Sequence, residues 1–214
     1  VHDVSVSLLV LGESIIWLKL WTTLAAKGLL DSKVTRKIIH TGSAPLFIAH
    51  WPLYSSSWSA KYLAATVPLI QIISNKTVSC NGNQKNIHTN ELVMAVSRTG
   101  NKTEVLGGPL IYSVVLLLAT LVYFRESPAG VVAVAQMAAG DGLADIFGRK
   151  WGSAKWPFAP QKSVVGTAAF LIGAFVVTTA LLGLLNYTGE LYILTSLVIV
   201  YIYIVIVVVF VFQQ

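Results

Sequence analysis

Residues 106–124 read LGGPLIYSVVLLLATLVYF, a run of nineteen residues without a charged side chain. A helix needs about 20 apolar residues, within a range of roughly 17–25, to cross the hydrocarbon core of a bilayer. We interpret seven apolar segments of the chain as helical: 4–25, 38–54, 60–74, 106–124, 128–146, 164–185 and 191–212. The sequence therefore predicts an all-α, polytopic integral membrane protein with about seven transmembrane helices in a single transmembrane domain, residues 1–214.

The composition favours a bilayer as the solvent of this chain. Hydrophobic residues make up 55% of the sequence and charged residues 11%, whereas soluble domains carry about 25% charged residues. The net charge of +6 would suggest nucleic-acid binding in a soluble protein. Here the charges lie in short loops between apolar segments, which is typical of membrane topology signals. We therefore expect the lipid bilayer as a partner and no nucleic acid.

Basic residues alternate between the two ends of the segments. The loops 26–37, 75–105 and 147–163 contain four lysines or arginines each, whereas only Lys61 lies at the second loop, just after it, only Arg125 lies in the fourth loop, and the sixth has none. Such an alternation is what the positive-inside bias produces. It supports the count of seven segments, and it places the N-terminus on the side opposite the basic loops. The basic side is then the one on which nucleotides are found.

The second and third segments are weaker candidates for spanning helices. The second contains Pro45 and Pro52 together with two histidines, and the third is short. Both could be broken or re-entrant, which a membrane tolerates only where protein shields the backbone or where it lines a cavity.

The strongest candidate site is GDGLADIFGRK, residues 140–150, at the end of the fifth segment. Asp141 and Asp145 are four residues apart and share one face of a helix. Two carboxylates there repel each other and are costly near hydrocarbon, and a divalent cation relieves both costs. Mg²⁺ accepts carboxylate and phosphate oxygens, and Gly140 and Gly142 leave the backbone open to a phosphate. We therefore expect Asp141 and Asp145 to bind Mg²⁺.

A second interpretation makes the acids part of a solvated helix end, paired with Arg149 and Lys150. It applies best to Asp145, which lies four residues before Arg149. It applies less well to Asp141, because acids inside a membrane segment are commonly functional. We favour the metal site.

The loop after the acids is rich in cations, which stabilise a transferring phosphoryl group. Its members are Arg149, Lys150, Lys155 and Lys162. Lys162 and Ser163 resemble the end of a phosphate-binding loop, although the glycine run of a Walker motif is missing. We expect these residues to bind the nucleotide, and they also fit a positive-inside anchor with Trp151 and Trp156 at the interface.

A further polar group opens the second segment, at Arg36, Lys37 and His40. Arg36 and His40 are four residues apart and share a helix face. The cations could bind a phosphate, and His40 could act as a general base. A membrane-edge cluster with a buried histidine explains the same residues equally well.

These motifs resemble the phytol kinase and farnesol kinase family of plastids and cyanobacteria, over roughly residues 34–190. The matching stretches are RKIIHTGS from Arg36, WPL from Trp51, EVLGGPL from Glu104, FRESP from Phe124 and, most specifically, GDGLADIFGRKWG from Gly140. The resemblance implies an enzyme of a chloroplast envelope or thylakoid membrane. Such an enzyme transfers phosphate from CTP, or another nucleoside triphosphate, to an isoprenoid alcohol. Phytol is the first candidate, and its phosphate feeds tocopherol (vitamin E) and phylloquinone synthesis.

The resemblance breaks down at residues 191–214. The family continues there with a Glu-Ser-Leu-Pro and an Asp-Asp-Asn motif, whereas this chain has an apolar Val/Ile/Tyr tract. We expect this atypical C-terminal helix to reflect a truncated or mis-spliced gene model.

We therefore expect Asp141, Asp145, Lys162 and His40 to be catalytic. The expected nucleotide-binding residues are Arg36, Lys37, Gly140, Gly142, Arg149, Lys150, Lys155 and Ser163. Two other functions stay open from the sequence. One is a membrane CTP-dependent cytidylyltransferase of the CDP-diacylglycerol synthase type, and the other is a transporter with an intramembrane acid pair.

Overall fold

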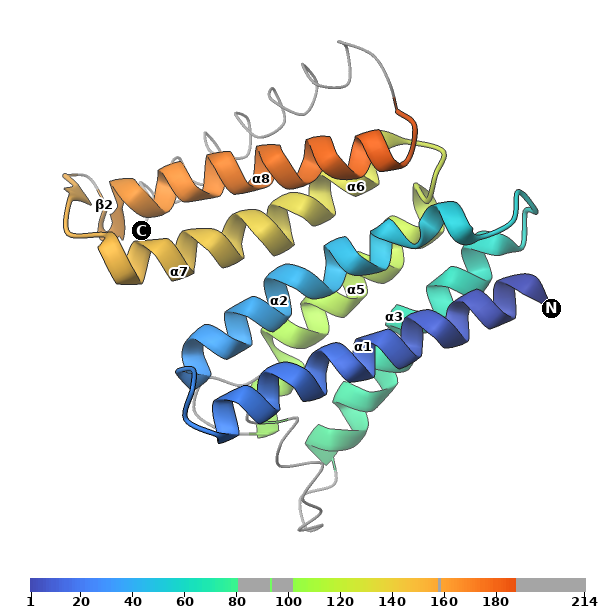
Figure 1. Ribbon diagram of the computed structural model, residues 1–214, viewed down its shortest axis with the longest axis horizontal. Helices are drawn as coiled ribbons and strands as arrows, with labels where there is room; N and C mark the ends of the chain where they lie inside the picture. The colour runs from blue at the N-terminus through green and yellow to red at the C-terminus, as the bar shows by residue number, and fades with distance from the viewer. Residues whose placement is uncertain (81–92, 94–101, 158, 188–214) are drawn as a thin grey trace. The chain divides into compact units, whose positions relative to one another are not determined.

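The computed structural model describes residues 1–80, 93, 102–157 and 159–187 of the chain (Figure 1). This part is almost wholly helical, which confirms the helical fold class. The α-helices are α1 (His2–Ala26), α2 (Ser32–Ala49), α3 (Ala60–Cys80), α5 (Gly108–Val122), α6 (Pro128–Ala135), α7 (Asp141–Trp151) and α8 (Val164–Leu184).

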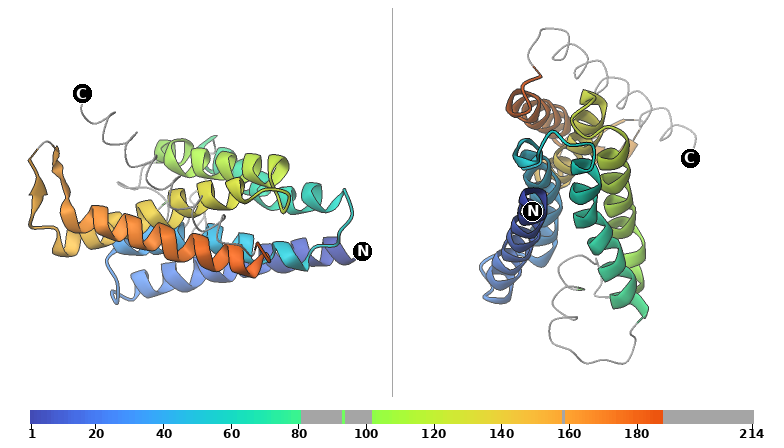
Figure 2. Two further views of the ribbon diagram at one scale, coloured as in Figure 1. Left: turned by 90° about the horizontal axis from the view of Figure 1, so that it is seen from above. Right: turned by 90° about the vertical axis from the view of Figure 1, so that its right-hand side faces the viewer.

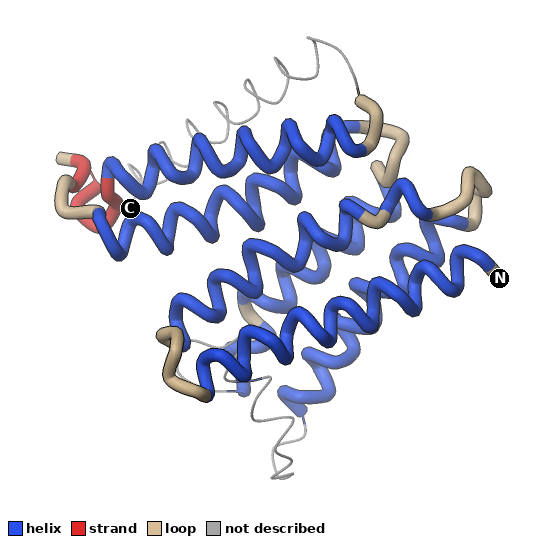
Figure 3. The backbone as a smooth tube through the Cα atoms, viewed as in Figure 1, coloured by secondary structure: helices blue, strands red, loops and turns tan. Residues whose placement is uncertain are grey.

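Shorter elements connect these helices. Two 3₁₀ turns, η1 (Trp51–Leu53) and η2 (Lys102–Leu106), precede α3 and α5, and a π-helical turn, η3 (Gln136–Gly140), joins α6 to α7. The strands β1 (Lys155–Trp156) and β2 (Ala159–Ser163) form an antiparallel hairpin between α7 and α8, drawn in red in Figure 3.

Four helices in the described part are long and apolar enough to cross a membrane: α1, α5 with η2, the continuous helix α6–η3–α7, and α8. Helices α2 and α3 do not meet that criterion, and each contains an internal proline, Pro45 and Pro68. Pro45 does not end α2, which continues to Ala49 and is followed by η1. The predicted segment 191–212 lies outside the described residues. The described part of the chain therefore contains four candidate membrane-spanning helices.

The chain packs as two compact units, and the boundary between them falls within α2. Unit 1 comprises residues 1–39 and 50–124, and unit 2 comprises residues 40–49 and 125–214.

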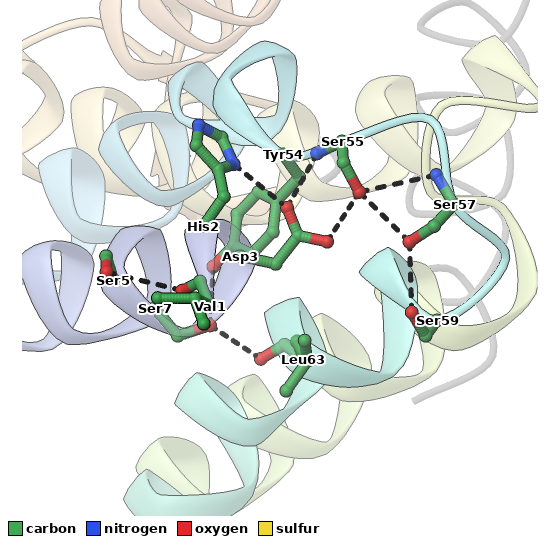
Figure 4. Close-up of polar contacts among 10 residues, drawn as sticks. All are labelled: Val1, His2, Asp3, Ser5, Ser7, Tyr54, Ser55, Ser57, Ser59 and Leu63. Carbon is green, nitrogen blue, oxygen red and sulfur yellow. Dashed lines mark hydrogen bonds and ion pairs between the residues drawn. The ribbon is translucent and has the colours of Figure 1, made fainter.

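Hydrogen bonds in unit 1 hold the start of α1 against the turn that follows η1 (Figure 4). The Asp3 carboxylate accepts hydrogen bonds from the backbone N–H of Ser55, at 2.7 Å, and from its hydroxyl, at 2.6 Å. The Ser7 hydroxyl lies 3.1 Å from the Tyr54 hydroxyl and donates to the carbonyl of Leu63. A carboxylate buried at this depth is tolerated because its oxygens are satisfied.

Unit 1 also contains an acidic residue within a candidate span. Glu13 lies in the middle of α1, and its Oε2 is 2.8 Å from Nε2 of His50, just after α2. Ionisable groups within a membrane segment usually pair in this way. Sequence analysis did not single out Glu13, although a lone acid in an apolar run is a signal that could have found it.

The core of unit 2 depends on glycines between α7 and α8, which run side by side in Figures 1 and 2. A Cβ at Gly166 would lie 3.0 Å from the carbonyl oxygen of Ala144 and 3.4 Å from the Cα of Gly148. A Cβ at Gly140 would lie 2.8 Å from the ring of Phe170. Small residues at helix contacts let membrane helices approach closely. The glycines therefore set the distance between α7 and α8.

This packing predicts opposite effects for two substitutions in α8. We expect Gly166→Ala to destabilise the protein by about 1–3 kcal/mol, because the new methyl group overlaps the backbone of α7. Gly183 has no neighbour within 4 Å of its Cβ position, so Gly183→Ala should raise stability by about 0.5–1 kcal/mol. Thermal unfolding of both variants in detergent checks the pair, and equal Tm shifts would contradict it.

Candidate active site

The acid pair follows a local change of helix type. Helix α6 passes into the π-turn η3, and Asp141 is the first residue of α7 directly after it. Single π-turns inside α-helices are rare and occur frequently at functional sites. The Asp141 side chain is exposed and Asp145 is half-buried, one α-helical turn later. The structure therefore places both predicted carboxylates on one helix of unit 2.

The second half of α2 contacts this helix at two points. Nε2 of His40 lies 3.3 Å from the carbonyl oxygen of Met137, within η3. Because a carbonyl oxygen only accepts, Nε2 is the nitrogen that donates in this contact. His40 is thus held against the turn that leads to Asp141.

The second contact explains one of the two glycines beside Asp141. A Cβ at Gly142 would overlap the Thr41 hydroxyl and lie 2.9 Å from the Thr41 Cβ. Since Phe170 fills the corresponding space at Gly140, helix packing accounts for both glycines. Their predicted contact with a phosphate stays a prediction.

Asp145 pairs with Arg149, as predicted by the interpretation of the acids as a solvated helix end. Its Oδ1 lies 2.8 Å from Nε of Arg149, four residues on, and the Arg149 side chain is 53% exposed. An exposed pair of this kind contributes at most about 1 kcal/mol. It can therefore open for a stronger ligand at little cost, and Asp141 remains the acid that this pair does not explain.

Asp141 and Asp145 offer two carboxylates to a metal ion. Among the described residues no group of three or more His, Cys, Asp or Glu side chains is positioned to hold a metal ion. Mg²⁺ commonly binds through one or two carboxylates, substrate phosphates and water. Asp141 and Asp145 fit a Mg²⁺ ion that arrives with a nucleotide better than one held in a preformed protein cage.

The predicted cations gather at the other end of α7. Arg149 and Lys150 occupy its last turn, Lys155 lies on β1 and Lys162 on β2, and all four side chains are exposed. Lys155 and Lys162 make no ion pair with a described residue, so their charge is available to an anion. At 1.5 Å per residue, Arg149 lies about 12 Å from Asp141 along the helix axis.

Ser163 has a structural role at the base of the hairpin. Its hydroxyl oxygen accepts the N–H of Gly166, at 3.0 Å, and caps α8. Its side chain is 6% exposed, and a Cβ at Gly152 would meet it. Ser163 joins the end of α7 to the start of α8, and its contact with a nucleotide stays a prediction.

Arg36 and Lys37 lie in the half of α2 that belongs to unit 1. Both side chains are half-buried. Their position relative to Asp141 is not determined, so their proposed phosphate contacts stay predictions.

Sequence analysis missed the polar residues that accompany the acids in unit 2. Thr41, Gln136 and Thr178 each have a buried polar atom without a hydrogen-bond partner in the described part of the chain. Gln136 interrupts an otherwise apolar run just before Asp141. A single amide side chain within such an apolar run is a sequence signal that could have identified Gln136.

Comparison with known proteins gives close relatives. The chain is 36% identical over 193 residues to "Probable phytol kinase, chloroplastic" of Triticum aestivum, covering 90% of this chain and 63% of that protein. It is 38% identical over 182 residues to "Probable phytol kinase 1, chloroplastic" of Oryza sativa subsp. japonica, covering 85% and 56%. It is 36% identical over 195 residues to "Phytol kinase 1, chloroplastic" of Arabidopsis thaliana, covering 89% and 62%.

The chain thus spans about three-fifths of the length of these relatives. No family model matches the chain. No solved structure matches it either.

Proposed function

Because the chain is homologous to the chloroplast phytol kinases over most of its length, we propose that it phosphorylates an isoprenoid alcohol, with phytol as the first candidate. The observation that carries this proposal is the arrangement in unit 2. An acid pair within a candidate membrane span lies on the same short helix, α7, as Arg149 and Lys150, and an exposed hairpin with Lys155 and Lys162 follows it. Phosphoryl transfer requires such an arrangement, because catalysis consists mainly of positioning and charge stabilisation.

The proposed donor is CTP or another nucleoside triphosphate, bound with Mg²⁺. Asp141 and Asp145 would hold the ion, which neutralises charge on the phosphate oxygens. Lys155 and Lys162 would bind the phosphates beyond it, together with Arg149 once it releases Asp145. This division of roles follows from the length of α7, which separates Asp141 from the hairpin.

In the reaction, the alcohol oxygen forms a bond to the γ-phosphorus, and the bond between that phosphorus and the β–γ bridging oxygen breaks. The hydroxyl proton passes to a base, and His40 or a carboxylate of the acid pair is the proposed acceptor. The products are the isoprenyl monophosphate and a nucleoside diphosphate. The hydrocarbon tail stays among apolar helix faces, as expected for a substrate dissolved in the bilayer.

We place this activity in a chloroplast membrane, because the names of the relatives say chloroplastic and four helices in the described part of the chain are long and apolar enough to cross a membrane. We also propose the topology of about seven segments, with the N-terminus opposite the basic loops. The product would feed tocopherol and phylloquinone synthesis.

One assay tests the function directly. Membranes that contain the chain are incubated with labelled CTP, ATP, GTP or UTP and with phytol, geranylgeraniol, farnesol or dolichol. We expect phytyl monophosphate and a nucleoside diphosphate. A CDP-lipid and pyrophosphate would instead identify a cytidylyltransferase, and the absence of a nucleotide-dependent product would refute a kinase.

A further inference from the structure

Gln136 is a buried amide inside a candidate membrane span. Its side chain is 3% exposed, and its Nε2 has no hydrogen-bond partner among the described residues. It lies at the first position of η3, five residues before Asp141. A buried donor that lacks a partner destabilises a fold, so its presence next to the acid pair calls for a ligand.

A second orphaned polar group lies on the facing helix. Thr178 of α8 is 0% exposed, and its hydroxyl has no partner among the described residues. Other hydroxyls of the chain donate to the carbonyl four residues earlier, as Thr120 does to Leu116 at 2.7 Å and Thr167 does to Ser163 at 3.2 Å. Thr178 does not use this local solution.

The packing register places Gln136 and Thr178 on facing helices, within about one helical turn of each other. Gly140 faces Phe170, and Phe170, Ala174 and Thr178 follow one another at four-residue spacing on one face of α8. Because α8 runs antiparallel to α7, moving back one turn from Gly140 brings Gln136 level with Ala174, and Thr178 lies one turn further along this stripe. Helix α8 indeed contacts both η3 and α6.

The chemistry of this contact selects a single hydroxyl group. A hydroxyl can accept a hydrogen bond from the Gln136 amide and donate one to the Thr178 oxygen. The neighbouring Ala138, Ala139 and Ala174 are all 0% exposed and apolar, which excludes a charged ligand. Gln136 lies about 7 Å from Asp141 along the helix axis, so the hydroxyl would be bound near the acid pair.

We propose that Gln136 and Thr178 bind the hydroxyl group of the acceptor alcohol and thereby select alcohols from the hydrocarbons dissolved in the bilayer. This inference rests on the proposed function, since it assigns the acceptor subsite of that reaction. It makes Gln136 and Thr178 specificity residues, whereas Asp141 and Asp145 face the nucleotide.

The test uses two apolar replacements of similar size, Gln136→Met and Thr178→Val. We expect each to raise the KM for phytol by about tenfold, the usual effect of losing one buried hydrogen bond, and to leave the KM for the nucleotide unchanged. The matched control is Thr120→Val, because Thr120 is equally buried but satisfied within its own helix. An unchanged KM for phytol in both variants would overturn the proposal.

Thermal unfolding supplies a second readout that does not need turnover. Phytol should raise the Tm of the wild-type protein, the corresponding hydrocarbon phytene should not, and Gln136→Met should abolish the shift caused by phytol. If the amide only holds a structural water, Gln136→Met will lower the Tm without phytol and keep the phytol shift, which refutes the proposal. If phytol raises the Tm of the wild type but not that of the variants, and the wild type does not phosphorylate phytol, this subsite is supported and the kinase is refuted. If the variants still phosphorylate phytol as the wild type does, the kinase is supported and this subsite is refuted. If the wild type shows neither a phytol-induced Tm shift nor turnover, both proposals are refuted.

Discussion

Asp141→Asn is expected to lower kcat/KM for the alcohol by at least about 100-fold, without loss of membrane insertion. Asparagine keeps the size of the side chain and removes the charge that would hold the metal ion. A metal ion contributes several kcal/mol of charge stabilisation to phosphoryl transfer, and each 1.4 kcal/mol or so corresponds to a factor of ten in rate. Steady-state kinetics in membranes at several Mg²⁺ concentrations measure the effect.

A control separates a metal role from a general loss of charge. Asp31→Asn changes a carboxylate in the exposed turn before α2, outside unit 2, and should leave activity intact. Asp145→Asn removes the second acid of the pair together with its ion pair to Arg149, and it should also lower activity. Substantial turnover by Asp141→Asn at saturating Mg²⁺ would refute the metal role of Asp141.

The helices were predictable where apolar length alone decides them. The segments predicted at 4–25 and 164–185 are α1 (His2–Ala26) and α8 (Val164–Leu184). The third segment was predicted to end at residue 74, whereas α3 continues to Cys80. Backbone hydrogen bonds continue through polar residues such as Asn75, so the end of an apolar run does not mark the end of a helix.

The fifth segment shows what a pattern of apolar residues cannot reveal. Its helix contains the π-turn η3, Gln136–Gly140, which the apolar pattern does not predict. His40 contacts Met137 of that turn across 97 positions of the chain. No spacing within residues 128–146 encodes this contact. The hairpin 155–163 was likewise read as a loop, because its strands are short and contain Pro160, which is rare in strands.

The candidate site was likewise predictable where spacing along one helix decides it, and not where other helices do. The i,i+4 spacing placed Asp141 and Asp145 on one helix and offered Arg149 as a partner of Asp145, and the salt bridge confirms that pairing. The role of the glycines could not be read from spacing, because their neighbours Thr41 and Phe170 come from other helices. Local spacing therefore identifies which charges meet on one helix, while tertiary packing decides which small residues are indispensable.

Gly142→Ala is expected to lower kcat/KM by roughly 10–100-fold, although the residue carries no functional group. The new methyl group overlaps the Thr41 hydroxyl, so α2 must move away from α7. Overpacking of this kind costs about 1–3 kcal/mol of stability. Since His40 precedes Thr41, the same movement disturbs its contact with Met137, and a displacement of about 1 Å in a site can cost about 100-fold in rate.

A double variant shows whether the steric contact is the cause. Thr41→Ala removes the overlapping hydroxyl, but its Cβ would still lie 2.9 Å from that of residue 142. We therefore expect Thr41→Ala to restore part of the activity and Tm of Gly142→Ala, with a coupling energy of about 0.5–3 kcal/mol between neighbours. Additive effects in this cycle would mean that α2 does not hold α7 through Thr41. The position of Asp141 would then have to be fixed by α8 alone, through the contact of Gly140 with Phe170.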